Sequence, residues 1–244
     1  MQNLEKTSMA FIPGAYKANS LFTILNRPGV GKFVWNPQTY IELDYEIKYG
    51  GWRRPVVLKS KLKNKKQADH AIKNIIELIN EILIKNENLD PNVNLIGYSL
   101  GGIVGFGMIP IESIIHPSPE APLKIKGGVL VLMCAYPHEH TMDLAKESPN
   151  DKKNPLGWKK IIGRYNPDDL VIPKEKTQEV EGFCQLIGIP LLWKESKAKE
   201  HGFLGHGNLN KEDYEFIERA IELIIEDHEQ LQTTIRMTIE DQES

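Results

Sequence analysis

Residues 93–102 read Val93-Asn94-Leu95-Ile96-Gly97-Tyr98-Ser99-Leu100-Gly101-Gly102, an apolar run that leads into a Gly-x-Ser-x-Gly motif. The apolar residues predict a buried strand and the small residues after them predict a helix, so Ser99 falls on a sharp turn between the two. We expect strained backbone angles at Ser99, and a collision with the neighbouring strand or helix if Gly97 or Gly101 carried a side chain. Such a turn displays the Ser99 hydroxyl at the carboxyl edge of a sheet and aims the Leu100 N–H at whatever the hydroxyl attacks.

The composition is that of an ordinary globular chain of 244 residues with a net charge of −3. This charge favours neither nucleic acid nor a membrane surface as a partner. No apolar run approaches the ~20 residues that a transmembrane helix needs, and the polar N-terminus, Met1–Ser8, has no signal-peptide pattern. Cys134 and Cys184 lie in apolar stretches and are expected to be reduced core thiols, so we expect a cytoplasmic protein. The sequence indicates no oligomeric state.

Strand-like and helical segments alternate along the chain, which predicts an α/β fold with a mostly parallel sheet and helices on both faces. The expected strands are Ser8–Ile12, Phe33–Trp35, Thr39–Tyr45, the run ahead of Ser99, Gly127–Cys134, Lys160–Tyr165 and Ile187–Trp193. The expected helices are Gln67–Leu83, a glycine-rich helix that ends near Pro110, Lys174–Leu186 and Lys211–Glu229, and the polar residues 86–92 are expected to be a connection. We expect one domain over residues 1–230, with a short lid at about 135–157 and a polar tail at 231–244.

A nucleophilic serine needs a base, and the base needs a group that orients it. Sites in parallel sheets form at the carboxyl ends of the strands, so we look for both groups in loops that follow strands. Asp168 and Asp169 follow the strand Lys160–Tyr165, and His201 and His206 lie in a loop rich in glycine and histidine after the last strand. We prefer His206 because it stands between two glycines just before the last helix.

The first strand ends in Pro13-Gly14, a turn that exposes backbone N–H groups above the sheet. Ala15 N–H is therefore the candidate second donor to an oxyanion, beside Leu100 N–H. Tyr16 and Tyr98 are our candidate substrate-binding residues.

With these residues in place, the chain from about Met9 to Ile225 resembles a compact member of the α/β-hydrolase superfamily, without that family's first two strands. The order serine, aspartate, histidine is the order of that family. Pro13-Gly14-Ala15 resembles its oxyanion turn, and Gly205-His206-Gly207 resembles the Gly-His that precedes its last helix. Asp169 is followed four residues later by Pro173, as the acid of the family is, and this selects Asp169 over Asp168.

The resemblance implies a serine hydrolase that cleaves an ester or thioester of a small-molecule acyl substrate, with no cofactor. Ser99 would be the nucleophile, His206 the base and Asp169 the group that orients it. An acyltransferase that uses the same acyl-enzyme is an alternative. A binding protein without catalysis on the same fold is another, because fold does not imply function.

Three other interpretations are weaker. A dinucleotide site is disfavoured because Gly97-Tyr98-Ser99-Leu100-Gly101-Gly102 has no glycine where the pyrophosphate must approach. His138-Glu139-His140 could bind a metal, but no further ligands follow at a recognisable spacing, and a polar lid segment is the favoured interpretation. The seven basic residues between Arg53 and Lys66 could attract an anion, but a solvated loop is favoured.

Overall fold

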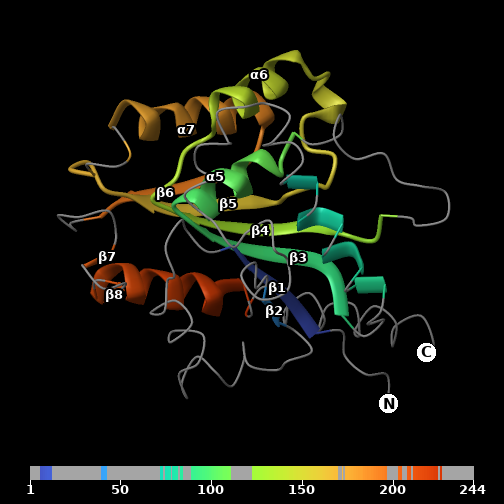
Figure 1. Ribbon diagram of the computed structural model, residues 1–244, viewed down its shortest axis with the longest axis horizontal. Coiled ribbons are helices and arrows are strands. Elements are labelled where there is room, and N and C mark those ends of the chain that lie inside the picture. The colour runs from blue at the N-terminus through green and yellow to red at the C-terminus, as the bar shows by residue number, and fades with distance from the viewer. Residues whose placement is uncertain are drawn as a thin grey trace, which may run out of the picture.

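The computed structural model describes residues 6–12, 40–42, 72–84 apart from 74, 78 and 82, 89–110, 123–169, 172, 174–196, 203–204, 208–209, 211–224 and 226. Within them, six strands form one parallel sheet in the order β2-β1-β3-β4-β5-β6 (Figure 1). The strands are β1 (Lys6–Ile12), β2 (Tyr40–Glu42), β3 (Leu89–Tyr98), β4 (Lys126–Met133), β5 (Lys160–Tyr165) and β6 (Leu191–Glu195). The predicted parallel α/β architecture is confirmed, and the strand that leads to Ser99 lies inside the sheet.

The carboxyl-terminal halves of the two middle strands, residues 95–98 of β3 and 129–133 of β4, are apolar because both of their faces are covered. Leu95 of β3 pairs with Leu130 of β4, and both side chains lie in a first hydrophobic core. The next pair, Ile96 and Val131, lies in a second core on the opposite face. This alternation is the period of two that a strand imposes on its side chains.

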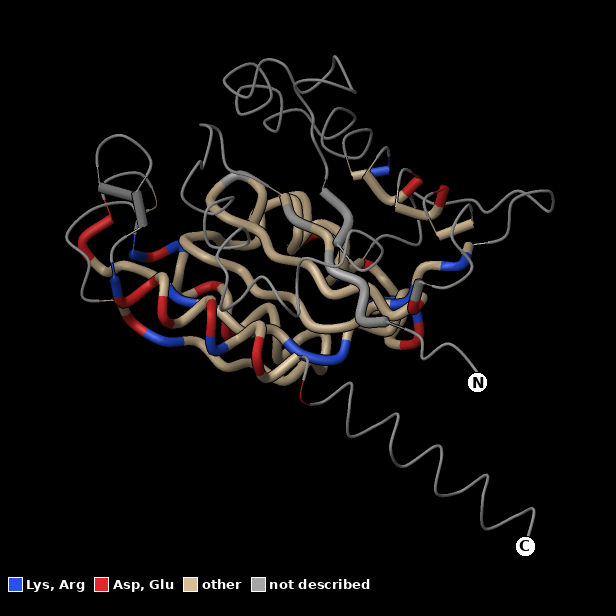
Figure 2. Tube along the Cα trace, turned by 90° about the horizontal axis from the view of Figure 1, so that it is seen from below, with Lys and Arg blue, Asp and Glu red and all other residues tan. Residues whose placement is uncertain are grey.

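Helices cover both faces, as the sequence predicts. The first core is covered by helical residues 72–84, α5 (Leu100–Gly107), α6 (Glu139–Glu147) and α7 (Lys174–Ile187). Helical residues 211–224 and 226, called helix 211–226 below, cover the second core on the other side of the sheet (Figure 1). The charged residues gather on the outer helices and turns, as Figure 2 shows.

β3 begins earlier than predicted, at Leu89, and includes Asp90 and Pro91, which the sequence indicates as a connection. The Asp90 carboxylate is buried and accepts hydrogen bonds from the Asn92 backbone and side-chain amides, both at 2.8 Å. The pairing with β1 changes register at the same end of the strand, between Lys6 and Ser8. Such irregularities let a strand include a proline, which has no N–H to donate to its neighbour.

β6 begins later than predicted, because the preceding helix extends to Ile187. Gly188 has a φ of 78°, and its N–H and that of Ile189 both donate to the Cys184 carbonyl, at 2.9 and 3.1 Å. A glycine with positive φ directly after a helix is a common way to end it. The predicted strand start at Ile187 is therefore wrong, and the strand starts at Leu191.

Residues 135–157 contain α6 and the short 3₁₀ turn η2 (Asn150–Lys152), where the sequence indicates an irregular polar segment. Ala145 of α6 is fully buried in the first core, and α6 lies beside α7 (Figure 1). The Trp158 Nε1–H, just beyond the segment, donates to the Met108 carbonyl at 3.1 Å. These contacts place the segment in the helical layer, and its role as a lid stays a prediction.

Two predicted features, the strand Phe33–Trp35 and the basic segment Arg53–Lys66, lie outside the described residues. Cys134 and Cys184 are both buried and free of disulfides, which confirms them as core thiols. None of the helices in the described part of the chain has the length and apolar character to cross a membrane.

Candidate active site

The turn at Ser99 has the geometry that the sequence predicts. Ser99 has φ 51° and ψ −116°, and it joins the end of β3 to the start of α5. Among the described residues, Ser99 and Cys134 are the two non-glycine residues with positive φ. A backbone of this kind costs about 1–3 kcal/mol and persists only where its surroundings hold it. Here the Ser99 N–H donates to the Met133 carbonyl at 2.9 Å, and the Ser99 carbonyl accepts from the Ile103 N–H at 3.0 Å.

Glycines allow the strand and the helix to meet closely at this turn. A Cβ atom at Gly97 would lie 2.7 Å from the Gly101 carbonyl oxygen and 2.9 Å from the Gly102 Cα atom. A Cβ atom at Gly102 would lie 2.4 Å from the Cβ atom of Ala135. Position 97 therefore needs glycine because a larger side chain would collide with the start of α5, as the motif predicts.

We expect Gly97→Ala to destabilise the fold by about 1–3 kcal/mol, because the added methyl group meets backbone atoms that have no room to move. Urea denaturation followed by circular dichroism measures this change. Gly182→Ala is the matched control, since a Cβ atom on that exposed residue of α7 has no neighbour within 4 Å. It should stabilise the protein by roughly 0.5–1 kcal/mol. A Gly97→Ala protein as stable as the unmodified chain would contradict the tight packing.

Of the two candidate oxyanion donors, Leu100 lies among the described residues and Ala15 does not. Leu100 is the first residue of α5, and the first N–H groups of a helix have no acceptor within the helix. Its role as an oxyanion donor stays a prediction. Ala15 and the candidate substrate-binding residue Tyr16 lie outside the described residues.

The two candidate acids lie in the turn after β5 and differ in their exposure to solvent. Asp169 is 8% exposed, and its Oδ1 atom accepts a hydrogen bond from the Ile172 N–H at 3.0 Å. Asp168 is exposed, and its N–H donates to the Asn166 Oδ1 atom at 2.9 Å. A buried carboxylate held by a backbone donor is better suited to orient an imidazole than an exposed one, so the environment favours Asp169.

Both candidate bases, His201 and His206, lie outside the described residues. Two short strands, β7 (Phe203–Leu204) and β8 (Asn208–Leu209), are described on either side of position 206. They pair antiparallel, with Phe203 opposite Leu209. The assignment of the base stays a prediction.

Tyr98 and Cys134 lie beneath the turn, in the second core. The Tyr98 hydroxyl donates a hydrogen bond to the Cys134 sulfur, and burial raises the pKa of both groups, with the charges of Asp169 and Asp213 adding to the effect. Tyr98 is 3% exposed, which does not favour its predicted contact with substrate. Neither group is ionised near neutral pH, so neither is suited to act as a base.

The metal candidate His138-Glu139-His140 forms the start of α6. His138 is the N-cap residue, and its Nδ1 atom accepts from the His140 N–H at 3.3 Å. Burial lowers the pKa of His138, and His140 is buried in the protein. In the described parts of the chain, no group of three or more potential ligands is arranged to hold a metal ion.

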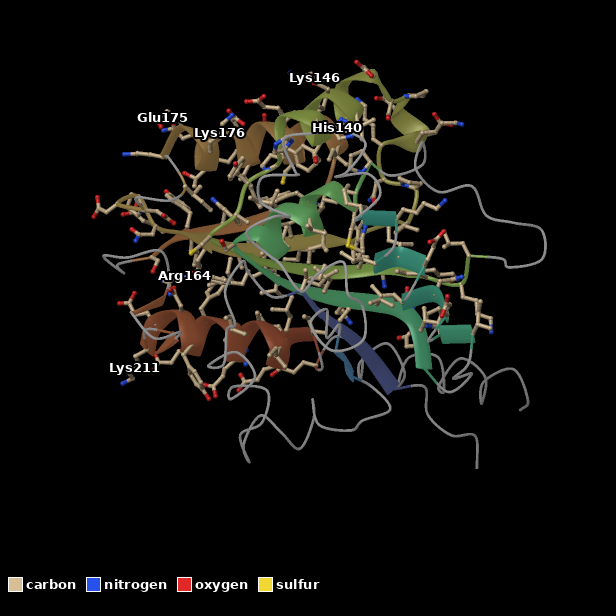
Figure 3. The ribbon with its side chains drawn as sticks, in the orientation of Figure 1. His140, Lys146, Arg164, Glu175, Lys176 and Lys211 are labelled. Atoms are coloured by element: carbon tan, nitrogen blue, oxygen red, sulfur yellow. The ribbon has the colours of Figure 1, made fainter. Side chains whose placement is uncertain are left out.

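A buried polar group beside the site is not evident from the sequence. Arg164 of β5 forms an ion pair with Asp213 of helix 211–226 at 3.2 Å, and Ser196 donates a hydrogen bond from its hydroxyl to the same carboxylate at 3.0 Å. Figure 3 shows Arg164 between the sheet and the start of that helix. The sign of this group in the sequence is an arginine that directly follows Ile161, Ile162 and Gly163 in a strand. In the sequence, Asp213 stands three residues after Asn210, a spacing that indicates a helix cap and gives no sign of the ion pair with Arg164.

The sequence matches no protein-family model and no curated protein. Solved structures are similar to it. SOBER1 of Arabidopsis thaliana superposes with a TM-score of 0.59 at 14% identity, over 90% of this chain and 99% of that one. Esterase PE8 gives 0.57 at 13% identity, over 90% and 93%. Thermogutta terrifontis esterase 2, phosphoramylated by tabun, gives 0.56 at 13% identity, over 93% and 85%. At these identities the likeness establishes a shared fold.

Proposed function

We propose that this chain, which has the α/β-hydrolase fold, is a serine hydrolase that cleaves an ester or a thioester through an acyl-enzyme on Ser99. The observation that carries the proposal is the backbone of Ser99, with its φ of 51° between β3 and α5. Strain of this kind clusters at functional sites, and a serine held in this way at the carboxyl edge of a parallel sheet is placed to attack a substrate.

In the proposed reaction, the Ser99 Oγ atom attacks the carbonyl carbon while His206 takes the hydroxyl proton. Asp169 holds the imidazole in the required tautomer and stabilises the imidazolium that forms. The backbone N–H groups of Leu100 and Ala15 bind the oxyanion, each worth about 3 kcal/mol in the transition state. His206 then protonates the leaving group, and in the second half of the reaction it activates the water that releases the acyl group.

The esterases among the similar structures support this chemistry. Thermogutta terrifontis esterase 2 is phosphoramylated by tabun in one of these structures and phosphonylated by cyclosarin in another. Organophosphorus reagents of this type are electrophiles that an activated nucleophile attacks. We therefore test the proposal with a fluorophosphonate probe, followed by peptide mass spectrometry. Covalent labelling at Ser99 is the expected result. An unlabelled protein that still binds acyl ligands would favour the non-catalytic alternative.

The two candidate bases are distinguished by the variants His201→Ala and His206→Ala. We expect His206→Ala to lose about 10⁴-fold or more in kcat on p-nitrophenyl acetate, because serine is a weak nucleophile without its base. We expect His201→Ala to keep its rate within a few-fold. The reverse result would move the base to position 201, and full activity in both variants would contradict the triad.

The substrate is proposed to be a small acyl compound, and its acyl length is to be measured with a series of p-nitrophenyl esters and acyl thioesters. Product analysis with added alcohol or thiol acceptors distinguishes hydrolysis from transfer to an acceptor. A reducing, cytoplasmic location is part of the proposal, and the two free core thiols support it.

A further inference from the structure

We propose that Arg164, Ser196 and Asp213 form a positioning network that fixes both ends of the segment 197–210, which carries both candidate bases, against the strand that leads to Asp169. The inference rests on the proposed function and assigns to that site the residues that set the position of its base. The name "Arg164 network" is used below for these three residues.

Arg164 lies on the face of β5 that helix 211–226 covers. It stands two positions after Ile162, whose side chain belongs to the second core with Ile217 of helix 211–226. Residues two apart on a strand share a face. The Arg164 side chain is 10% exposed, and a guanidinium in such a place is costly unless charged and polar groups surround it. Its described partners come from the two chain segments that flank positions 197–210.

On the upstream side, Arg164 holds the end of β6. Its Nη2 group donates to the Glu195 carbonyl at 3.1 Å. The next residue, Ser196, donates its backbone N–H to the Tyr165 carbonyl at 2.7 Å. Ser196 is the last described residue before the segment, so the point at which the segment leaves the sheet is held by a side chain and by the backbone.

On the downstream side, Arg164 holds the start of helix 211–226. Its Nη1 group pairs with the Asp213 Oδ1 atom at 3.2 Å, and its Nη2 group pairs with the Glu212 Oε2 atom at 3.1 Å. The guanidinium carbon also lies 5.4 Å from the centre of the Phe216 ring, within the range of a cation–π contact. One buried side chain therefore contacts residues on both sides of the segment.

The residues on the two sides of the segment also contact one another directly. The Ser196 Oγ–H donates to the Asp213 Oδ1 atom at 3.0 Å, across 17 positions of sequence. The two residues are 2% and 1% exposed. A hydrogen bond to a buried carboxylate is among the stronger ones, because the acceptor is charged and shielded from water.

The backbone links the Arg164 network to the turn at Ser99. The Ser99 N–H donates to the Met133 carbonyl, and the N–H of the next residue, Cys134, donates to the Arg164 carbonyl, both at 2.9 Å. The carboxyl ends of β3, β4 and β5 are thus joined in sequence, and the Arg164 side chain continues the connection to positions 195 and 213. A base must lie within hydrogen-bond distance of the hydroxyl it activates, so a shift of the segment changes the rate.

The variant Ser196→Ala tests the Arg164 network with the smallest change. It removes the direct bond between the two ends and leaves the Arg164–Asp213 ion pair in place. A displacement of about 1 Å in a catalytic group costs up to about 100-fold in rate. We therefore expect kcat on p-nitrophenyl acetate to fall roughly 10- to 100-fold, with KM within about twofold. The rate of fluorophosphonate labelling should fall in parallel, since both reactions use the base.

Asp213→Asn is the companion variant. It keeps an oxygen for Ser196 and removes the charge that faces Arg164, and its fall in kcat should be at least as large. Glu222→Gln is the matched control, because it breaks the exposed ion pair between Glu222 and Arg219 on the same helix, away from the segment. Thermal melting of each variant sets an assay temperature at which all are folded. If Asp213→Asn does not fold, Ser196→Ala alone decides the result.

The outcomes separate this inference from the proposed function. Loss of rate in Ser196→Ala, with an unchanged rate in Glu222→Gln and an inactive Ser99→Ala, supports the Arg164 network. A Ser196→Ala protein with a lower melting temperature and a full kcat would overturn the positioning role. It would not affect the proposed function as a serine hydrolase. An equal loss in Glu222→Gln would also overturn it, since the effect would not be local. Full activity in Ser99→Ala would overturn the proposed function itself.

Discussion

Ser99→Ala is expected to reduce hydrolysis of p-nitrophenyl acetate by roughly a million-fold, the scale of loss when a serine nucleophile of this kind is removed. The variant keeps a Cβ atom, so the strain at φ 51° and the packing around the turn are preserved. Steady-state kinetics on purified protein measures the loss, and circular dichroism shows that the fold is intact. Turnover that persists in a highly purified Ser99→Ala sample would contradict the assignment of Ser99 as the nucleophile.

Ser99→Gly is the control that separates chemistry from conformation. Glycine adopts positive φ without the steric cost that other residues bear, so this variant should be as inactive as Ser99→Ala. It should also be more stable than Ser99→Ala, by up to about 1–3 kcal/mol if the strain is fully relieved. Such a gain in stability with a loss of activity is expected where backbone strain serves function. Equal stability of the two variants would mean that the turn is not strained.

Asp169→Asn is expected to lower kcat by about 10⁴-fold, because an amide in place of the orienting carboxylate favours the wrong tautomer of the base. The Ile172 N–H can still donate to the remaining oxygen, so the turn after β5 should keep its shape. KM should change little, since the carboxylate does not bind the acyl group in the proposed reaction. Kinetics with p-nitrophenyl acetate at a pH above the titration of the base measures this loss.

Asp168→Asn is its matched control, one residue away in the same turn. Asp168 is exposed, and the same substitution there should leave kcat within about twofold, as expected of a surface change. If Asp168→Asn is the inactive variant and Asp169→Asn is active, the acid has been assigned to the wrong residue. If both retain full rate, the carboxylate of the triad lies elsewhere, and Asp213 becomes the next buried acid to test.

Much of the fold follows from local patterns along the chain. The continuous apolar run at Gly127–Cys134 corresponds to β4, and the spacing of Ile72, Ile75, Ile76 and Ile79 corresponds to one buried helix face. The predictions are wrong at element ends and in residues 135–157, where the sequence does not indicate α6. β3 extends through Pro91 because a register shift accommodates it, and α7 extends to Ile187 because Gly188 ends the helix there. Such ends depend on pairing with distant residues as well as on local propensity.

The sequence alone determined the turn at Ser99 and the parallel sheet that carries it. Both depend on short-range properties, the small volume of glycine beside a serine and the alternation of strands with helices. Only the tertiary structure distinguished a buried Asp169 from an exposed Asp168, and only it brought Arg164 together with Ser196 and Asp213. Burial and ion pairing depend on which distant segments meet, and no local pattern in the sequence reports that.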